Sequence, residues 1–282
     1  MNHEVRVLID TLNCFTRGGY KYEDEKKLLK LNVEQLRDAE VFLPDDLNAL
    51  EERPLETKPL SSKCVYRTEN IDSFVCAEKI MREYPDSKPL VLNLANPVNI
   101  GGGVRRGARA QEEDLCRRSS LLINLEGEKA HPYYDYNRSF HTNMGTHALI
   151  VTDNVEVIKD THYHYMEDSY IVAVMTCAAP YLGYGKEGMC DAEYEDLLRT
   201  RISGMLKAAA YKGYRHLVLG AFGCGAFLND ANTVAKAFKD VFDSFRFHEL
   251  NMDQLFESVD FAVLCRRDTY NYDQFHALFH DE

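Results

Sequence analysis

Residues 91–122 read VLNLANPVNIGGGVRRGARAQEEDLCRRSSLL. The apolar residues 91–95 have the length and composition of a buried strand, and Asn96-Pro97 interrupts them. Three glycines follow at 101–103, and Gln111-Glu112-Glu113 then begins a predicted helix. A strand that leads through a glycine-rich turn into a helix presents backbone N–H groups to phosphate. Because this helix begins with two carboxylates, which repel phosphate, the pattern indicates chemistry beside an anion.

Predicted strands and helices alternate along most of the chain. The strands are at 64–68, 90–95, 146–153, 169–179, 216–221 and 259–265, and the helices at 5–15, 74–84, 110–124, 192–211, 232–245 and 271–279. Residues 126–145 predict a long loop or a short helix near a pocket. Such alternation is typical of an α/β layered domain with a parallel or mixed sheet, in which ligands bind beyond the carboxyl ends of the strands. Glycine-rich stretches follow the strands at 90–95 and 216–221, so we expect both at one rim of the sheet.

The first 62 residues carry no motif that we can interpret. Residues 23–52 are rich in charge and predict mostly helix, interrupted at Pro44. We therefore predict an N-terminal helical extension, residues 1–62, packed on a core domain of residues 63–282.

The composition limits the classes of function. The 282 residues carry a net charge of −12, which argues against general nucleic-acid binding. Residues 101–120 differ from the rest of the chain, because this segment contains five arginines and only three carboxylates. Its local positive charge suits an anionic ligand. The first residues, MNHEVRVLIDTLN, are too polar for a signal peptide, and no run approaches the ~20 apolar residues of a membrane span. We predict a soluble, cytoplasmic protein without a membrane partner.

The cysteines and histidines do not predict a metal site. None of the eight cysteines belongs to a CxxC pair, and several lie inside apolar runs, which is typical of reduced core cysteine. His162 and His164 would share a face if they lay on a strand, but no third ligand is suitably spaced. We predict neither a metal nor a cofactor.

The spacing of the three glycines and Gln111-Glu112-Glu113 resembles the signature of poly(ADP-ribose) glycohydrolases. Residues 101–122 resemble the short microbial type of that family, and GAFGCGAF at residues 220–227 resembles its second ligand loop. The resemblance begins near residue 63. It implies a macrodomain fold, which is a three-layer α/β/α sandwich. It also implies metal-free hydrolysis of the ribose–ribose O-glycosidic bonds of poly(ADP-ribose) at chain ends, with release of ADP-ribose.

The two glutamates are the candidate catalytic residues. Cleavage of a glycosidic bond needs an acid for the departing oxygen and stabilisation of an oxocarbenium-like transition state. Adjacent residues on a helix point about 100° apart, so Glu112 and Glu113 cannot face each other as an ordinary glycosidase pair does. The resemblance implies that Glu113 is the acid and later the base for water, and that Glu112 binds and orients the ribose. The alternative is that both glutamates only complement the helix dipole.

The resemblance also implies the residues that bind ADP-ribose. They are Asn96, Asn99, Gly101, Gly102, Gly103, Gln111, Gly223, Cys224, Gly225, Ala226 and Phe227. Glycine and alanine keep N–H groups accessible to a pyrophosphate, and Phe227 would stack on the ligand. Each asparagine is equally compatible with a turn, and Phe227 with core packing. We reject Cys224 as a nucleophile because no base lies near it in sequence. Asp230 adds a negative charge beside the second loop.

Two alternative functions stay open. One is hydrolysis of mono-ADP-ribosyl adducts on protein or nucleic acid, which the two glutamates would also allow. The other is a non-catalytic ADP-ribose-binding module, which needs the loops but not a second glutamate.

Overall fold

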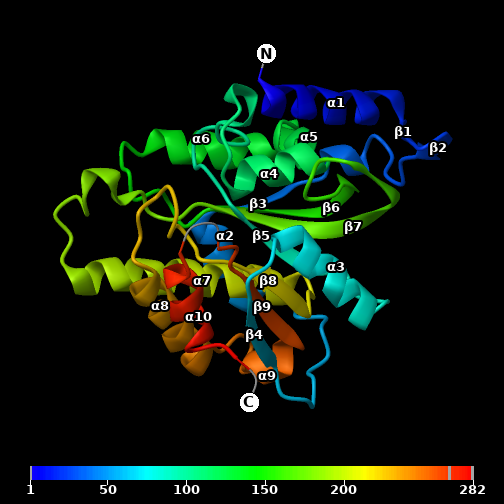
Figure 1. Cartoon of the computed structure of the whole chain (residues 1–282). Coiled ribbons are helices and arrows are strands. Elements are labelled where there is room, and N and C mark those ends of the chain that lie inside the picture. Colours follow the sequence, from blue (N-terminus) through cyan, green and yellow to red (C-terminus); the bar gives the residue numbers. More distant parts are fainter. Residues whose placement is uncertain (1, 266–267, 281–282) are drawn as a thin grey trace.

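The computed structural model describes residues 2–265 and 268–280, and Figure 1 shows their helices on both sides of a central sheet. The helices are α1 (His3–Arg17), α2 (Pro44–Ala49), α3 (Ser73–Glu83), α4 (Gln111–Arg118), α5 (Leu121–Leu125), α6 (His131–Ser139), α7 (Asp191–Tyr211), α8 (Ala231–Ser244), α9 (Met252–Leu255) and α10 (Tyr270–His276). The strands are β1 (Gly19–Tyr22), β2 (Glu25–Leu28), β3 (Glu40–Phe42), β4 (Val65–Glu69), β5 (Leu90–Leu94), β6 (Leu149–Lys159), β7 (Tyr165–Cys177), β8 (His216–Leu219) and β9 (Ser258–Ala262).

In the described residues, one mixed sheet has the strand order β3-β6-β7-β5-β8-β9-β4. The pairs β3–β6 and β6–β7 are antiparallel, and the pairs from β7 to β4 are parallel. At the centre, Leu90 pairs with Ala173 of β7 and with Leu217 of β8. Strands covered on both faces read as nearly continuous apolar runs, which is why β5 and β8 could be recognised in the sequence.

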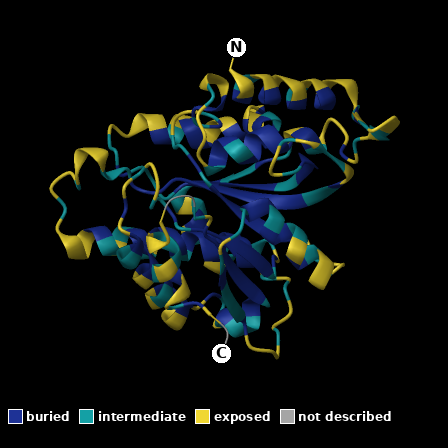
Figure 2. Cartoon of the chain, viewed as in Figure 1, coloured by how far each residue is buried: buried dark blue, intermediate teal, exposed yellow. Residues whose placement is uncertain are grey.

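Helices cover both faces of the sheet. Buried residues of α3, α4, α5 and α6 pack on one face, and those of α2, α7, α8 and α10 pack on the other. Figure 2 shows the strands between them as buried and the outer faces of α1 and α8 as exposed. The predicted three-layer α/β/α sandwich with a mixed sheet is confirmed. None of the helices in the described ranges is long and apolar enough to cross a bilayer.

The N-terminal segment is less helical than predicted. The helix predicted at 5–15 is present as α1, and Gly18, in the left-handed conformation at φ +72°, ends it. The mostly helical prediction for 23–52 is wrong, because β2 and β3 lie within it, β2 in a hairpin with β1. β3 pairs with β6 of the main sheet, and the buried carboxylate of Glu156 accepts the N–H groups of Lys30 and Leu31. Such partners lie more than a hundred residues away, so local propensity could not predict them. The domain boundary at residue 62 stays a prediction.

The single helix predicted at 110–124 is wrong in its second half. The chain turns extended at Ser119, with φ −146°, and Ser119 forms a β-bridge with Val157. Ser120 N–H donates to the carbonyl of Glu156 at 3.0 Å. Pairing with β6 therefore divides the segment into α4 and α5. The other predicted strands and helices are present with shifted ends, and α6 lies within the predicted loop or short helix at 126–145.

Candidate active site

The loops that follow β5 and β8 line one cavity of about 570 Å³. β5 and β8 are parallel neighbours, so their carboxyl ends place both glycine-rich loops at the same rim, as predicted. The predicted site residues that line the cavity are Asn96, Asn99, Gly102, Gly103, Gln111, Glu112, Glu113, Gly223, Gly225, Ala226 and Phe227. Gly101 and Cys224 do not line it.

Glu112 is almost fully buried, with 2% of its surface exposed. One carboxylate oxygen accepts the N–H of Asn96 at 2.8 Å, and the other lies 3.5 Å from Nδ2 of Asn93. Burial raises the pKa of Glu112 to about 8; the N–H of Asn96 opposes this, and the negative charge of Glu113 adds to it. Glu112 is therefore mostly protonated at neutral pH.

Glu113 connects the start of its own helix to the glycine turn. Its Oε1 accepts the N–H of Gly103 at 2.7 Å, and its Oε2 accepts the N–H of Ala110 at 2.9 Å. Ala110, the N-cap residue of α4, has no side chain that could accept a hydrogen bond. Only one of the two hydrogen bonds of a capping box is therefore formed, the one from Ala110 N–H to Glu113. The carboxylate is thereby fixed at the wall of the cavity.

Gly102 is the point at which both carboxylates meet the loop. A Cβ on Gly102 would lie 2.5 Å from Oε1 of Glu113 and 2.8 Å from Oε2 of Glu112. Both glutamate side chains are long enough to bring a carboxylate oxygen to this glycine. Gly102 is also left-handed, with φ +61°. The missing side chain leaves space against both carboxylates.

Gly101 has a packing role instead. A Cβ there would lie 2.7 Å from Cδ1 of Leu122, on the side of the helical layer. Its φ of +65° also requires glycine.

Gln111 fixes α4 to the sheet. Its Oε1 accepts the N–H of Leu94 at 2.9 Å, and its Nε2 donates to the carbonyl of Leu92 at 2.7 Å and to Oγ of Ser73 at 3.2 Å. The amide therefore continues the hydrogen-bonding edge of β5 and sets where the glutamates begin. A ligand contact by Gln111 stays a prediction.

The two asparagines after β5 differ in role. Asn96 forms the turn, since its Oδ1 accepts the N–H groups of Val98 and Asn99 at 3.0 and 2.8 Å. Asn99 is exposed at the cavity and donates Nδ2 to Asn96 at 3.3 Å. Asn99 is thus better placed than Asn96 to contact a ligand through its side chain.

The second loop presents backbone N–H groups. In the described part of the chain, the amides of Gly223, Gly225, Ala226 and Phe227 donate to no protein acceptor, whereas Cys224 N–H donates to the carbonyl of Ala221 at 3.0 Å. The Cys224 thiol lies 3.6 Å from the carbonyl of Phe222, and burial raises its pKa. A thiol with a raised pKa is a poor nucleophile, in agreement with its rejection as one.

Phe227 both packs and lines the cavity. Its ring meets the edge of Tyr181 at a centroid distance of 5.5 Å and an interplanar angle of 80°. It also contacts the core beneath α7 and α8. Part of the ring is therefore held by protein, while the residue forms part of the cavity wall.

Asn229 holds the second loop closed, and sequence reasoning missed it. Its Nδ2 donates to the carbonyls of Pro180, Gly223 and Phe227 at 2.8, 3.0 and 3.3 Å. Its Oδ1 accepts the hydroxyl of Tyr194. An asparagine in a glycine-rich loop signals only a turn, so no local pattern could have identified this role. Asn93, which was also missed, lies inside β5, where its polar side chain interrupts an apolar run.

Asp230 caps a helix rather than facing the cavity. Its Oδ2 accepts the N–H of Thr233 at 2.9 Å at the start of α8, and its Oδ1 accepts the hydroxyl of Tyr270 at 2.8 Å. Burial would raise the pKa of Asp230, but the hydrogen bonds from Tyr270 and Thr233 outweigh it, and the pKa is lowered. The Thr233 hydroxyl donates to Oδ2 as well, so three donors offset the charge of Asp230.

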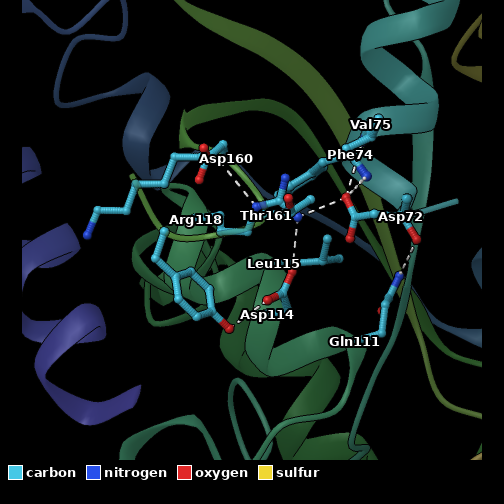
Figure 3. Close-up of polar contacts among 12 residues, drawn as sticks. Asp72, Phe74, Val75, Gln111, Asp114, Leu115, Arg118, Asp160 and Thr161 are labelled. Atoms are coloured by element: carbon cyan, nitrogen blue, oxygen red, sulfur yellow. Dashed lines mark hydrogen bonds and ion pairs between the residues drawn. The ribbon is translucent and has the colours of Figure 1, made fainter. Parts of the chain in front are cut away.

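A buried ion pair supports the α4 helix from behind. Arg118, with 1% of its side chain exposed, donates Nη1 to Asp72 at 2.8 Å and to Asp114 at 3.0 Å. Figure 3 shows Asp72 between this guanidinium and the N–H groups of Phe74 and Val75, which it caps. The start of α3 and the end of α4 are therefore tied through one carboxylate.

The residues that the structure describes contain no group of three or more metal-ligating side chains. His162 and His164 lie in the turn between β6 and β7, where Asp160 accepts the N–H groups of both at 2.8 and 2.9 Å. Both histidines are exposed.

The family model for "Microbial-type PARG, catalytic domain" matches residues 9–160, which contain the glycine turn and both glutamates. A structure of poly(ADP-ribose) glycohydrolase (PARG) from Thermomonospora curvata has a TM-score of 0.86 and 25% identity, over 98% of this chain and 99% of that one. The same protein bound to the inhibitor ADP-HPD has a TM-score of 0.83 and 25% identity, over 96% and 97%. PARG from Deinococcus radiodurans in complex with ADP-ribose has a TM-score of 0.76 and 31% identity, over 88% and 98%. No curated protein matches the chain.

Proposed function

The chain belongs to the family of microbial-type PARG catalytic domains, and we propose that it is a glycosidase that hydrolyses the ribose–ribose O-glycosidic bonds of poly(ADP-ribose) from chain ends and releases ADP-ribose. The observation that carries the proposal is the convergence of Glu112 and Glu113 on Gly102, at the wall of a cavity that also contains the second loop. In that arrangement an acid can lie beside a glycosidic oxygen, while the backbone N–H groups of the second loop can bind a pyrophosphate.

The proposed reaction uses Glu113 as acid and then as base. Glu113 donates a proton to the departing ribose oxygen as the bond to the anomeric carbon breaks, and its carboxylate then stabilises the oxocarbenium-like transition state. Water attacks the anomeric carbon and returns a proton to Glu113. The backbone amides of Gly103 and Ala110 hold the carboxylate in one orientation through both steps.

The other residues orient the ligand. Glu112, buried and bonded to Asn96, is suited to a ribose hydroxyl, because its raised pKa lets it donate as well as accept. The unpaired amides of the second loop suit the pyrophosphate, and α8 adds the positive end of its dipole. Phe227 is suited to stacking on the ligand, and Asn99 to contact a ribose.

The test compares the parent with Glu113→Gln on poly(ADP-ribose). The expected result is release of ADP-ribose by the parent and loss of at least a hundredfold in kcat for the variant, since general acid catalysis contributes about 10²–10⁴-fold. Binding of ADP-ribose should be retained. Glu128→Gln, an exposed glutamate outside the cavity, is the matched control and should turn over normally.

Other outcomes would identify the alternatives. Binding of ADP-ribose without turnover by the parent would indicate a binding module. Turnover of mono-ADP-ribosylated protein or nucleic acid but not of polymer would indicate a mono-ADP-ribosyl hydrolase. The cytoplasmic location stays a prediction from the sequence, which fractionation of the native cells would test.

A further inference from the structure

The loop of residues 103–110 joins the glycine turn to α4 and borders Glu113. Gly103 and Ala110, at its two ends, both donate to the Glu113 carboxylate. Glu112 is instead bonded to Asn96, close to the end of β5. Glu113 therefore contacts both ends of this loop, whereas Glu112 contacts the end of β5.

Arg106 is in the middle of the loop, and its guanidinium turns back toward the acid. A Cβ on Gly103 would lie 3.5 Å from Oε1 of Glu113 and 3.8 Å from Nη2 of Arg106. The cation and the carboxylate are thus close to the same point, and both residues line the cavity.

The arginines of this loop differ in their partners. Arg105 is ion-paired with Glu126, and Arg109 with Glu4 of α1. Arg106 is exposed and makes no ion pair or side-chain hydrogen bond with any residue in the described ranges. Its charge is therefore available to a ligand.

The backbone that carries Arg106 is held in place. Val104 is fully buried, and Gly107 has φ +81° and lies against the side-chain amide of Asn2, with which an added Cβ would overlap. The backbone of Arg106 therefore needs little ordering when a ligand binds, so that the ordering cost falls on the side chain alone.

We infer that Arg106 binds a phosphate of the ADP-ribose unit on the leaving side of the scissile bond, which is the penultimate unit of the polymer. The inference rests on the proposed function. The departing oxygen belongs to a ribose that itself carries a pyrophosphate, whereas the leaving group of a mono-ADP-ribosyl adduct on protein does not. A guanidinium presents a planar set of donors that suits phosphate oxygens. Arg106 would thus favour polymer over single adducts.

The test measures kcat/KM of the parent, Arg106→Gln and Arg105→Gln on two substrates. One is poly(ADP-ribose), and the other is ADP-ribose joined through the anomeric oxygen of its terminal ribose to an uncharged aryl alcohol. Arg105 is the matched control, because it is adjacent and exposed but does not line the cavity. We expect Arg106→Gln to lower kcat/KM on polymer about tenfold, mainly through a higher KM. On the aryl substrate, kcat/KM should change by less than about twofold. Its KM on polymer should also depend less on ionic strength.

Three results would overturn the inference. They are an equal loss on both substrates, no loss on polymer, or an equal loss in Arg105→Gln. If the parent releases ADP-ribose from polymer and Arg106→Gln does so equally well, only this inference fails. If the parent does not cleave polymer, the proposed function fails with it.

Discussion

Gly102 lies against Glu113 so closely that a Cβ on the glycine would be 2.5 Å from the carboxylate Oε1. The same Cβ would be 2.8 Å from Oε2 of Glu112. The space beside the two acids therefore exists only because this residue has no side chain.

Gly102→Ala should abolish activity while the protein stays folded. The new methyl group would displace both carboxylates, and the φ of +61° would add strain of about 1–2 kcal/mol to an alanine. We expect a loss of at least about a hundredfold in kcat/KM. The measurement is ADP-ribose release, with melting temperature as the check on folding. Gly188→Ala is the control and should keep most of the activity, because Gly188 has a similar φ of +86°, does not line the cavity, and its added Cβ would meet nothing within 4 Å. Equal activities in the two variants would contradict the role assigned to Gly102.

Glu112 should make the folded protein less stable as the pH rises. Its pKa is about 8 in the folded state against an ordinary 4.5, so between these values the folded state holds a proton that the unfolded chain releases. The free energy of unfolding therefore falls from about pH 4.5 to pH 8, by a few kcal/mol from this group alone. Glu112→Gln, which mimics the protonated acid, should melt higher than the parent at pH 8.5, with the difference shrinking toward pH 4.5. A difference in melting temperature that does not grow with pH would argue against a buried proton on Glu112.

Asn229→Ala should loosen the second loop. The substitution removes the donor to three carbonyls, at Pro180, Gly223 and Phe227. We expect a loss of about 1–3 kcal/mol in the free energy of unfolding and weaker ADP-ribose binding, by about tenfold or more. Calorimetric titration with ADP-ribose and denaturant unfolding give both numbers. Asn232→Ala is the control, since that side chain makes no hydrogen bond within the described residues. The role of Asn229 would be refuted by ADP-ribose affinity that matches the control.

Arg118→Met should be among the more destabilising single substitutions at an arginine. It leaves Asp72 and Asp114 without their buried partner, and breaking a buried ion pair costs about 3–5 kcal/mol. Arg82→Met, which removes an ion pair with Glu78 from a side chain that is 77% exposed, should cost about 0–1 kcal/mol. Chemical denaturation of both variants measures the contrast. Similar midpoints would mean that the Arg118 pair adds little to stability.

The parts of the site that could be predicted are those encoded locally. The strand, the glycine turn and the glutamates lie within about thirty residues of one another. A strand that leads through a glycine turn into a helix is a local pattern that presents backbone N–H groups to an anion. Glu113 could be chosen as the candidate acid, but its bonds to Gly103 and Ala110 require the loop to fold back on the helix. The second loop could likewise be recognised in the sequence. The role of Asn229, which donates hydrogen bonds to three carbonyls and so holds that loop in place, could not.

What could not be predicted depends on distant partners. β3 has only three residues and owes its conformation to β6, far along the chain. Arg118 occupies the end of a helix, where the dipole already favours a cation, so its pairing with Asp72 gave no separate signal. The break at Ser119 has the same origin, because only the approach of β6 makes an extended residue favourable there.

The parallel pairing of β4 with β9 has a consequence for how the protein forms on the ribosome. Arg67 of β4 pairs with Asp260 of β9, so one edge of the sheet joins strands that lie about 190 residues apart in the sequence. At a synthesis rate of about 5–20 residues per second, β4 is made roughly ten to forty seconds before its neighbour. For much of that interval, the glycine turn and its glutamates have been synthesised while the second loop has yet to be translated. The two loops of the cavity can therefore meet only after the second loop has been translated, and a nascent chain stalled before that point lacks one wall of the cavity.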